Sequence, residues 1–429
     1  MSPRKLAFAL LQKAERNDQY LNIALDHALE ASGLGELDRA LAATLVYGVT
    51  ERRITLDHQI ERLSSRPAAE IDLAVRTALR LGLYQLAYLD RIPAHAAVDE
   101  SVSLVPRRAS GFVNAILRAF TRAPELIFPE RSAGIVPYLS VKYSVCAPLI
   151  EKLLAAYGEQ TTEEILRGFE QKTSETTLSV NTIKISREAL AEKLSANPTA
   201  FAPNGLTVRG SIRALDGFAQ GEFFVQDEAS QLCVEALGAK AGELIIDVCS
   251  APGSKSFGSA VRMKNQGQIL SFDLHEKKLS LIRSSAERLG IDIIQAQAHD
   301  GRDPIPELFG KADRVLCDVP CSGFGVLGKK PELRYKDPAA SEALPRIQRD
   351  ILENACQYLK CGGVLVYSTC TIFPEENEKN VEGFLASHPE FSLTPFSVGH
   401  FECPEGMVTL LPHIHATDGF FIARLTKNS

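Results

Sequence analysis

The feature that most constrains the fold of this chain is a strict alternation of strand-like and helical segments after Leu244. The strand-like runs are Leu244–Val248, Gln268–Phe272, Ile293–Ala296, Arg314–Asp318, Val364–Ser368 and Phe420–Leu425, and helical patterns lie between most of them. Parallel strands need crossover helices of this kind, because a short turn cannot return the chain to the starting edge of the sheet. The order therefore predicts a parallel, doubly wound α/β sheet.

The first 125 residues follow another pattern. Apolar residues recur at helix spacing in seven segments: Leu6–Gln12, Leu21–Glu30, Asp38–Tyr47, Leu56–Leu63, Ile71–Leu89, Ala94–Leu104 and Gly111–Phe120. Ile71–Leu89 is apolar on most sides, which predicts a central helix. This part of the chain is expected to be an all-α domain.

Between these two parts the pattern is mixed. Pro124, Pro129 and Pro137 make residues 124–140 a connection, because prolines so spaced discourage a long regular helix. Helical periodicity resumes at Val145, and short strand-like and helical runs follow to about residue 225. We therefore expect three segments: an all-α domain at 1–125, a linker with a small α+β module at 126–225, and an α/β domain at 226–429.

Charge and composition restrict the class of protein. The net charge is −6, yet residues 1–125 contain 16 Lys and Arg against 15 Asp and Glu, and 14 of those cations are Arg. Arg suits phosphate oxygens, although helix-surface charges balanced by acids explain the count equally well. No segment reaches the roughly 18 apolar residues of a membrane span or forms a signal-peptide core. The nine Cys are scattered, so we expect reduced thiols in a cytoplasmic protein without a membrane partner.

The first motif that carries chemistry is Asp247–Ser256, D-V-C-S-A-P-G-S-K-S, between a strand and a helix. Backbone N–H groups and small residues at such a junction let a ligand approach closely. The motif lacks the upstream glycine of a phosphate-binding Walker loop, which disfavours nucleotide hydrolysis. Asp273, twenty residues after Gly253, ends the next strand, where a carboxylate can accept both hydroxyls of a ribose. The pair fits an adenosine cofactor, while a turn and a helix-capping Asp explain either feature alone.

Two further motifs end neighbouring strands. Asp318–Gly325, D-V-P-C-S-G-F-G, brings Asp318 and Cys321 to the carboxyl edge of the sheet, and Tyr367–Glu378, Y-S-T-C-T-I-F-P-E-E-N-E, brings Cys370 to the same edge. Ligands of open α/β sheets bind at that edge. Cys370 alone would more often be an inert buried thiol. Two thiols and a carboxylate together predict a reactive site.

A zinc site is the competing interpretation of the cysteines. Cys317 and Asp318 are adjacent on one strand, so their side chains point to opposite sides of the sheet. A closed four-thiolate site that includes Cys317, Cys321, Cys356 and Cys361 is therefore disfavoured, and no His stands in an H-x-E or H-E-x-x-H arrangement. We expect no metal.

Taken together, the three motifs resemble the signatures of the RNA cytosine-5 methyltransferases that use S-adenosylmethionine, in order and spacing across Phe223–Leu425. The helical segment resembles the NusB-like domain that precedes the catalytic part in the bacterial 16S ribosomal RNA methyltransferase B group. That second resemblance is carried by Asp38-Arg39, Val46-Tyr47-Gly48, Ala78–Gly82 and Gly111–Ala115. Phe223–Ser230 is similar to the lead-in to the first strand of the methyltransferase domain.

The resemblance implies a Rossmann-like methyltransferase domain that binds S-adenosylmethionine. The residues expected to bind this cofactor are Cys249, Ser250, Ala251, Pro252, Gly253, Ser254, Lys255, Asp273, Asp300 and Asp318, with Asp273 on the ribose and Asp300 near the adenine. The chain departs from the family in having Ser254 where Gly is usual and Tyr335 where Trp is frequent. If position 254 needs a positive φ, Ser costs on the order of 1 kcal/mol.

The resemblance also implies a mechanism and a substrate. Carbon 5 of cytosine is a poor nucleophile until a thiolate adds to carbon 6. Cys370 is expected to make that attack, Cys321 to assist loss of the carbon 5 proton, and Asp318 to bind the exocyclic amine and ring nitrogen 3. Lys255 is expected to orient these groups or to hold a phosphate. The expected substrate is 16S ribosomal RNA and the expected state a monomer, with transfer RNA, or a noncatalytic role in ribosome assembly, as the alternatives.

Overall fold

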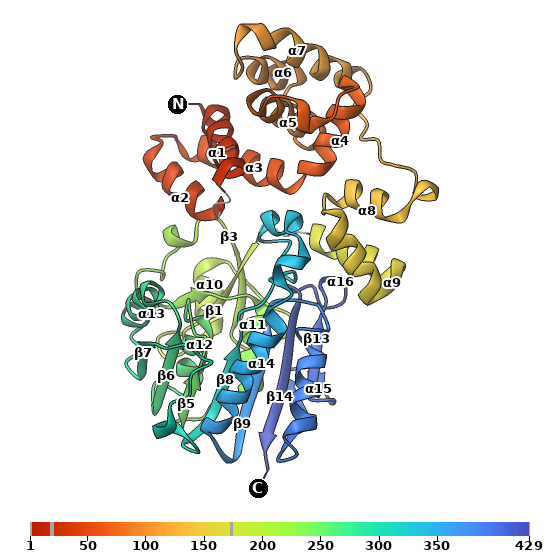
Figure 1. The fold of residues 1–429 in the computed structure, drawn as a ribbon. Coiled ribbons are helices and arrows are strands. Elements are labelled where there is room, and N and C mark those ends of the chain that lie inside the picture. The colour runs from red at the N-terminus through yellow and green to blue at the C-terminus, as the bar shows by residue number, and fades with distance from the viewer. Residues whose placement is uncertain (1, 18–20, 172–174, 429) are drawn as a thin grey trace. The chain divides into compact units, whose positions relative to one another are not determined.

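The computed structural model describes residues 2–17, 21–171 and 175–428 and contains two compact units (Figure 1). Unit 1 comprises Met1–Leu166 and Lys329–Pro338, and unit 2 comprises Arg167–Gly328 and Ala339–Ser429. The three-segment division at residues 125 and 225 stays a prediction about the chain.

Unit 1 is helical, and all seven helical segments expected in the first 125 residues are confirmed. Its helices are α1 (Pro3–Asn17), α2 (Leu21–Ala31), α3 (Glu36–Glu51), α4 (Arg53–Ser64), α5 (Leu73–Tyr88), α6 (Ala94–Val102), α7 (Arg107–Arg122), α8 (Ile135–Tyr143) and the first part of α9 (Ala147–Glu170). Helix α5 begins at the capping residue Asp72, whose carboxylate accepts the N–H groups of Ala74 and Val75. It packs against α1, α3, α4, α6 and α7, so it is the central helix, as expected.

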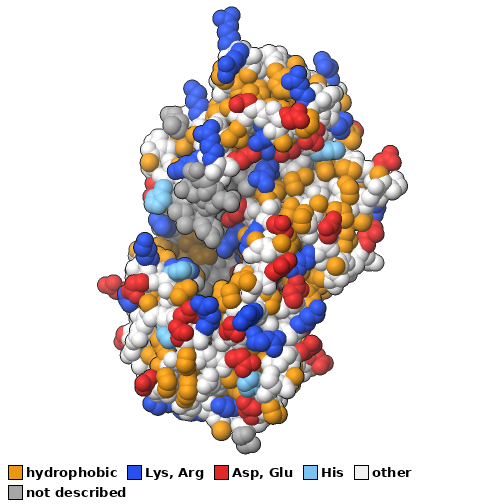
Figure 2. Space-filling model, in the orientation of Figure 1, with side chains coloured by type: hydrophobic (Ala, Val, Ile, Leu, Met, Phe, Trp, Pro, Cys, Tyr) orange, Lys and Arg blue, Asp and Glu red, His pale blue; other side chains and the backbone are white. Residues whose placement is uncertain are grey.

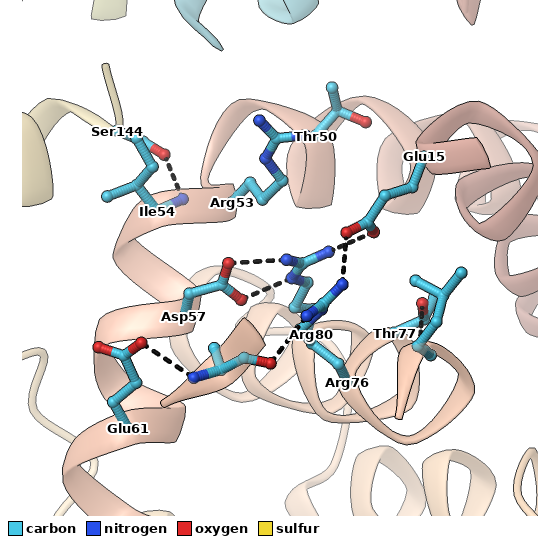
Figure 3. A network of polar contacts seen from close by, with 12 residues as sticks. Glu15, Thr50, Arg53, Ile54, Asp57, Glu61, Arg76, Thr77, Arg80 and Ser144 are labelled. Carbon is cyan, nitrogen blue, oxygen red and sulfur yellow. Dashed lines mark hydrogen bonds and ion pairs between the residues drawn. The ribbon is translucent and has the colours of Figure 1, made fainter. Parts of the chain in front are cut away.

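A network of charges around the buried Arg80 ties three helices of unit 1 together (Figure 3). The Arg80 guanidinium on α5 donates to both carboxylate oxygens of Asp57 on α4, at 2.6 and 2.7 Å, and to Glu15 on α1 at 2.7 Å. Arg76, one turn earlier on α5, donates to the other oxygen of Glu15 at 2.7 Å. Burial opposes the charge of Arg80, but these carboxylates raise its pKa. The Arg80 side chain therefore holds the helices together and is withheld from any phosphate.

The expected connection over residues 124–140 is wrong in its second half, where helix α8 begins at Ile135. Pro137 is the third residue of this helix. The N–H groups of the first helical turn have no intrahelical acceptor, so a proline there removes no hydrogen bond. The spacing of the prolines correctly predicted the irregular stretch before Ile135. It could not exclude a helix whose proline lies in the first turn.

Unit 2 is an α/β unit. Its strands are β1 (Glu175–Val180), β2 (Asn197–Pro198), β3 (Gly205–Arg209), β4 (Phe223–Val225), β5 (Leu244–Asp247), β6 (Gln268–Asp273), β7 (Ile294–Ala298), β8 (Ala312–Asp318), β9 (Leu359–Thr369), β10 (Phe391–Leu393), β11 (Phe396–Val398), β12 (Phe401–Cys403), β13 (Met407–Leu410) and β14 (Phe420–Lys427). Its helices, besides the end of α9, are α10 (Arg187–Leu194), α11 (Glu228–Leu237), α12 (Ser254–Arg262), α13 (Glu276–Leu289), α14 (Leu344–Ala355), α15 (Glu378–Ser387) and α16 (Pro412–His415).

The main sheet has the order β10-β14-β9-β8-β5-β6-β7, with β13 paired to β14. Strands β5 to β9 pair in parallel, as expected. The expectation of a parallel strand at Phe420–Leu425 is wrong, because β14 runs antiparallel to β9. Strand β14 also pairs antiparallel with β13, and only the four-residue helix α16 lies between them. So short a connection cannot make a parallel crossover.

Both faces of the main sheet are covered by helices (Figure 1). Successive strand residues alternate between two cores: Ile245 of β5 packs in the core with α11, α12 and α13, and Ile246 in the core with α14 and α15. This alternation follows from the two-residue period of a strand. It produces the near-continuous apolar strands that are visible in the sequence.

A smaller antiparallel sheet, β2-β3-β1-β4, packs with α10 and confirms the expected α+β module. Figure 2 shows Lys and Arg at several separate places on the visible face of unit 1, and both signs of charge interspersed on that of unit 2. Within the ranges that the structure describes, every helix is too short or too polar to cross a membrane.

Candidate active site

The three motifs meet where the strand order of unit 2 changes direction. Strand β5 has β6 on one side and β8 on the other, and β9 lies beyond β8. Crossovers that leave a central strand in opposite directions open a crevice at the carboxyl ends of the strands. Asp247, Asp318 and Thr369 end β5, β8 and β9 at this edge.

The loop after β5 is fastened to the end of β6. Ser250 donates its backbone N–H and its hydroxyl to the carbonyl of Phe272, at 2.7 and 2.9 Å. The carboxylate of Asp273 accepts the N–H of Ala251 at 3.2 Å and that of His275 at 3.0 Å. Each carboxylate oxygen has a second lone pair, so Asp273 keeps the capacity to accept two hydroxyls.

Gly253 turns this loop into helix α12. Its φ is +109°, and a Cβ there would lie 2.5 Å from the ring of Phe257, so both conformation and space require glycine. Ser254 is the first residue of α12 and is not among the residues with positive φ. The strain considered for Ser254 is therefore absent, because the special backbone conformation belongs to its neighbour.

Asp247 lies beneath the loop with almost no exposure. One carboxylate oxygen accepts the hydroxyl of Ser256 at 2.6 Å, and the other has no hydrogen-bond partner among the described residues. Burial raises the pKa of Asp247 to about 7. An unpartnered buried carboxylate oxygen below a small-residue loop fits a ligand with a polar or cationic group, such as the amino acid part of S-adenosylmethionine.

Lys255, which is buried, and Asp318, which is partly exposed, form an ion pair beside the loop. The Lys255 Nζ lies 2.6 Å from Asp318 Oδ2, and the Ser368 hydroxyl donates to Asp318 Oδ1 at 2.8 Å. Burial works against the lysine charge, but the Asp318 carboxylate raises the pKa of Lys255. The ammonium also lies 5.1 Å from the ring centroid of Phe420. This pair offers a fixed cation and a carboxylate acceptor at the same edge of the sheet.

The two candidate thiols lie next to each other. The Sγ atoms of Cys321 and Cys370 are 3.2 Å apart, and the backbone N–H of Cys370 points at Cys321 Sγ from 3.3 Å. The contact with Cys370, together with burial, raises the pKa of the Cys321 thiol well above its usual value. Either sulfur can be the donor in this contact, and the raised pKa disfavours the thiolate form of Cys321.

Asp300 lies in the turn after β7, the strand beside β6. Its carboxylate is paired with Arg302, and this hydrogen bond lowers the pKa of Asp300 to about 2. Its role near an adenine stays a prediction.

Sequence reasoning missed three residues that support the thiols and Asp318. Ser368 holds Asp318, as described above, and Gln348 and Glu376 bracket the Cys321 loop. Ser368 and Glu376 stand inside the third motif, but nothing in the sequence indicates that they are buried or which residues they contact. Gln348 lies on α14, outside every motif.

Comparisons with known proteins agree with this architecture. The model of the 16S rRNA methyltransferase RsmB/F family matches residues 234–426, and that of the NusB family matches residues 1–122. A Synechocystis protein named "Probable ribosomal RNA small subunit methyltransferase B" is 38% identical, with 100% of both chains covered. The "Ribosomal RNA small subunit methyltransferase B" of Klebsiella pneumoniae is 33% identical over 99% of this chain and 98% of its own.

Among solved structures, that of the protein PH0851 is similar over 100% of this chain and 99% of its own, with a TM-score of 0.80 and 27% identity. Full-length identity above 30% to named relatives, with both family models matched in the same chain, identifies the whole architecture and not only the α/β fold. The chain belongs to the RsmB/F family of 16S rRNA methyltransferases.

Proposed function

We propose that this protein methylates carbon 5 of a cytosine in 16S ribosomal RNA through a covalent adduct with Cys370. The observation that carries the proposal is the contact of two thiols, Cys321 and Cys370, at 3.2 Å beside neighbouring strand ends. Methyl transfer to an oxygen or an exocyclic nitrogen has no use for paired thiols. Methylation of a ring carbon needs one sulfur to activate the ring and a second group to take a proton.

The cofactor is S-adenosylmethionine, which supplies a methyl group on a positively charged sulfur. The loop of residues 249–255 would hold it, with Asp273 on the ribose hydroxyls and Asp300 near the adenine. Support comes from the free acceptor capacity of Asp273, the unpartnered oxygen of Asp247 and the close backbone approach that Gly253 permits. The acidic surroundings suit a cationic ligand.

Cys370 makes the first bond. Its sulfur, as a thiolate, adds to carbon 6 of the cytosine, and the electrons of the ring double bond move toward carbon 5. Carbon 5 then takes the methyl group as the bond between the methyl carbon and the sulfonium sulfur breaks, and that bonding pair stays on the sulfur. Lys255 balances the negative charge that develops on the ring. Asp318 accepts a hydrogen bond from the exocyclic amine, which cytosine has and uracil lacks, so this carboxylate selects the base.

Cys321 serves the release of product. Once the Cys370 sulfur is bonded to carbon 6, the thiolate contact that raises the pKa of the Cys321 thiol is gone, so this thiol can release its proton to water. Its sulfur then takes the proton from carbon 5. The bonding pair of that proton restores the ring double bond, and the bond between carbon 6 and the Cys370 sulfur breaks. Cys370 is thereby returned as a thiolate. The target base has to leave its stack for the sulfur to reach carbon 6.

Helix α7 of unit 1 offers a surface for the RNA. Arg107, Asn114, Arg118 and Arg122 are exposed and recur at helix spacing on one side of α7, and Val113, Ile116 and Leu117 are buried on the other. Within the described part of the chain, Arg118 is the only one of these three arginines with a carboxylate in ion-pair range. Its guanidinium lies 3.8 Å from Asp99. Such exposed pairs are weak, so phosphates can replace them.

The names of the relatives favour ribosomal over transfer RNA as the substrate, and the paired thiols favour an enzyme over a noncatalytic assembly factor. Bisulfite sequencing of 16S ribosomal RNA from cells with and without the gene tests the reaction and finds the nucleotide. A cytosine protected only when the gene is present supports the proposal. An unchanged 16S pattern with a protected transfer RNA cytosine moves the substrate to transfer RNA.

Removal of each thiol tests the covalent step. Cys370→Ala should form neither product nor adduct while it still binds cofactor. Cys321→Ala should accumulate a protein–RNA complex that survives denaturing electrophoresis, and the double variant should not. Cys361→Ala, at an exposed position, is the matched control and should behave as the unmodified protein. Trapping by Cys370→Ala would assign the attack to Cys321, and full activity of both single variants would rule out covalent catalysis.

A further inference from the structure

A buried carboxylate links the two loops that carry the thiols. Glu376 lies in the turn between β9 and α15 with 1% of its surface exposed. Within the described part of the chain, no Lys, Arg or His nitrogen lies within ion-pair distance of it, so it is not held as half of a salt bridge. Its Oε2 instead accepts two hydrogen bonds, from the Ser322 backbone N–H at 2.9 Å and from Gln348 Nε2 at 2.8 Å.

These contacts hold the backbone on both sides of Cys321, and the pair of Glu376 and Gln348 is called the clasp below. Ser322 follows Cys321 directly, and Pro320 precedes it, with its carbonyl accepting the second N–H of Gln348 Nε2 at 3.0 Å. The fully buried Gln348 is itself oriented by Asn380, which donates to Gln348 Oε1 at 2.9 Å. The backbone on either side of the thiol is therefore fixed by side chains that packing has already immobilised.

The clasp also fixes the Cys321 loop relative to the Cys370 loop. Glu376 is six residues beyond Cys370 in the same motif, and the Ser322 hydroxyl donates to Thr371 Oγ1 at 2.8 Å. The Glu376 backbone carbonyl accepts the Tyr367 hydroxyl at 2.6 Å, which anchors the turn to β9. The distance of 3.2 Å between the two sulfurs thus depends on a carboxylate that contacts neither of them.

We infer that Glu376, with Gln348, is a positioning residue that holds the Cys321 sulfur where it can take the carbon 5 proton. The inference rests on the proposed function and adds to it a residue for the release step. Cys370 lies on the loop that leaves β9 directly, so its attack on carbon 6 needs the clasp less. Loss of the clasp should therefore impair release more than attack.

The test is Glu376→Ala incubated with S-adenosylmethionine and the cognate RNA. Methyl transfer should continue, product release should slow about 100-fold, the loss typical of a group displaced by an ångström, and the protein–RNA adduct should accumulate as in Cys321→Ala. Cofactor affinity should stay within about twofold, because the clasp lies outside the 249–255 loop. Glu376→Gln keeps an acceptor oxygen and should recover most of the release rate. Glu382→Ala, an exposed position on α15, is the matched control.

A second readout needs no RNA. Diamide oxidises two neighbouring thiols to a disulfide and takes up their two protons and two electrons. The Cys321–Cys370 peptide, quantified by mass spectrometry, should form about tenfold more slowly in Glu376→Ala than in Glu382→Ala. This measurement reports thiol geometry even if the protein proves to have another substrate, so its failure is separable from failure of the proposed function.

Three results would overturn the inference. In the first, Glu376→Ala releases product and forms the disulfide at the rates of the unmodified protein. In the second, Glu376→Ala loses cofactor binding and activity equally and accumulates no adduct, and in the third, Glu376→Gln does not recover the release rate. The second of these would make Glu376 a residue of general stability. If Glu376→Ala does not fold, Gln348→Met removes the N–H donors to Glu376 and Pro320 at similar volume and must give the same slow release and slow disulfide formation.

Discussion

Replacement of Asp247 by Asn should change how the stability of unit 2 depends on pH. The carboxyl of Asp247 is buried at the end of β5, where it accepts the Ser256 hydroxyl, and the nearby charge of Lys255 offsets part of the effect of burial. Burial raises its pKa from 3.8 to about 7. The folded state therefore keeps a proton that the unfolded chain releases above about pH 4.

The size of the effect follows from this difference. Each pKa unit corresponds to about 1.4 kcal/mol, so Asp247 contributes stability that is complete below about pH 4 and falls by roughly 4 kcal/mol as pH rises through about 7. Between pH 5 and pH 8 the loss is about 3 kcal/mol. Asn cannot ionise, keeps an acceptor for Ser256 and nearly preserves the volume, so Asp247→Asn should escape this loss.

Urea unfolding without cofactor, followed by a probe in unit 2, measures the effect. The difference in unfolding free energy between Asp247→Asn and the unmodified protein should shift by about 3 kcal/mol in favour of the variant from pH 5 to pH 8. Titrating groups that do not interact with Asp247 cancel in this difference. Ser256→Ala removes the hydrogen bond that stabilises the ionised form and should move the pH window upward. A difference that does not change with pH would refute the burial argument.

Three further predictions concern other parts of the molecule. Arg80→Met should destabilise unit 1 by about 3–5 kcal/mol, seen as an earlier thermal transition, because it leaves Asp57 without its partner; an unchanged transition would contradict the network. Asp273→Ala should weaken S-adenosylmethionine binding by about 1.5–3 kcal/mol in calorimetry, and unchanged affinity would remove Asp273 from the cofactor site. Arg118→Gln combined with Arg122→Gln should weaken RNA binding and reduce the salt slope by about 1.5, with cofactor affinity intact; an equal slope would exclude this face of α7.

Patterns of local sequence predicted the elements and the edge where the site lies. Strand periodicity and the residues after each strand brought Asp318, Cys321 and Cys370 to one edge, since the carboxyl ends of parallel strands meet there. The direction of β14 was beyond that reasoning, because its burial on both faces makes it read like the parallel strands. Its direction is set by antiparallel pairing with β9, β10 and β13, and by the short connection from β13.

Side-chain partners far apart in the sequence were not predictable. Arg80 counted among the cations available for phosphate, yet Glu15 and Asp57, 65 and 23 residues away, neutralise it inside unit 1. Glu376 likewise stood in a motif without a role, because its acceptor function depends on Ser322, 54 residues earlier. Periodicity reports which side of an element is buried and carries no information about which buried charges meet.

The segment Lys329–Pro338 changes how RNA binding by unit 1 should be tested. This segment belongs to unit 1, although the sequence assigns it to the α/β domain. Arg334 donates to the Tyr143 carbonyl and to Glu51, and the Tyr335 hydroxyl donates to the Thr50 carbonyl at 2.5 Å.

A chain shortened to begin near residue 126 would lose Thr50 and Glu51. It would then expose the charged side chain of Arg334, which is almost fully buried in the whole chain and stands 13 residues after Cys321. Weak RNA binding by such a chain could come from a disturbed segment alone. Surface substitutions on α7 leave these contacts in place, so they, and not truncation, separate RNA recognition by unit 1 from its structural role.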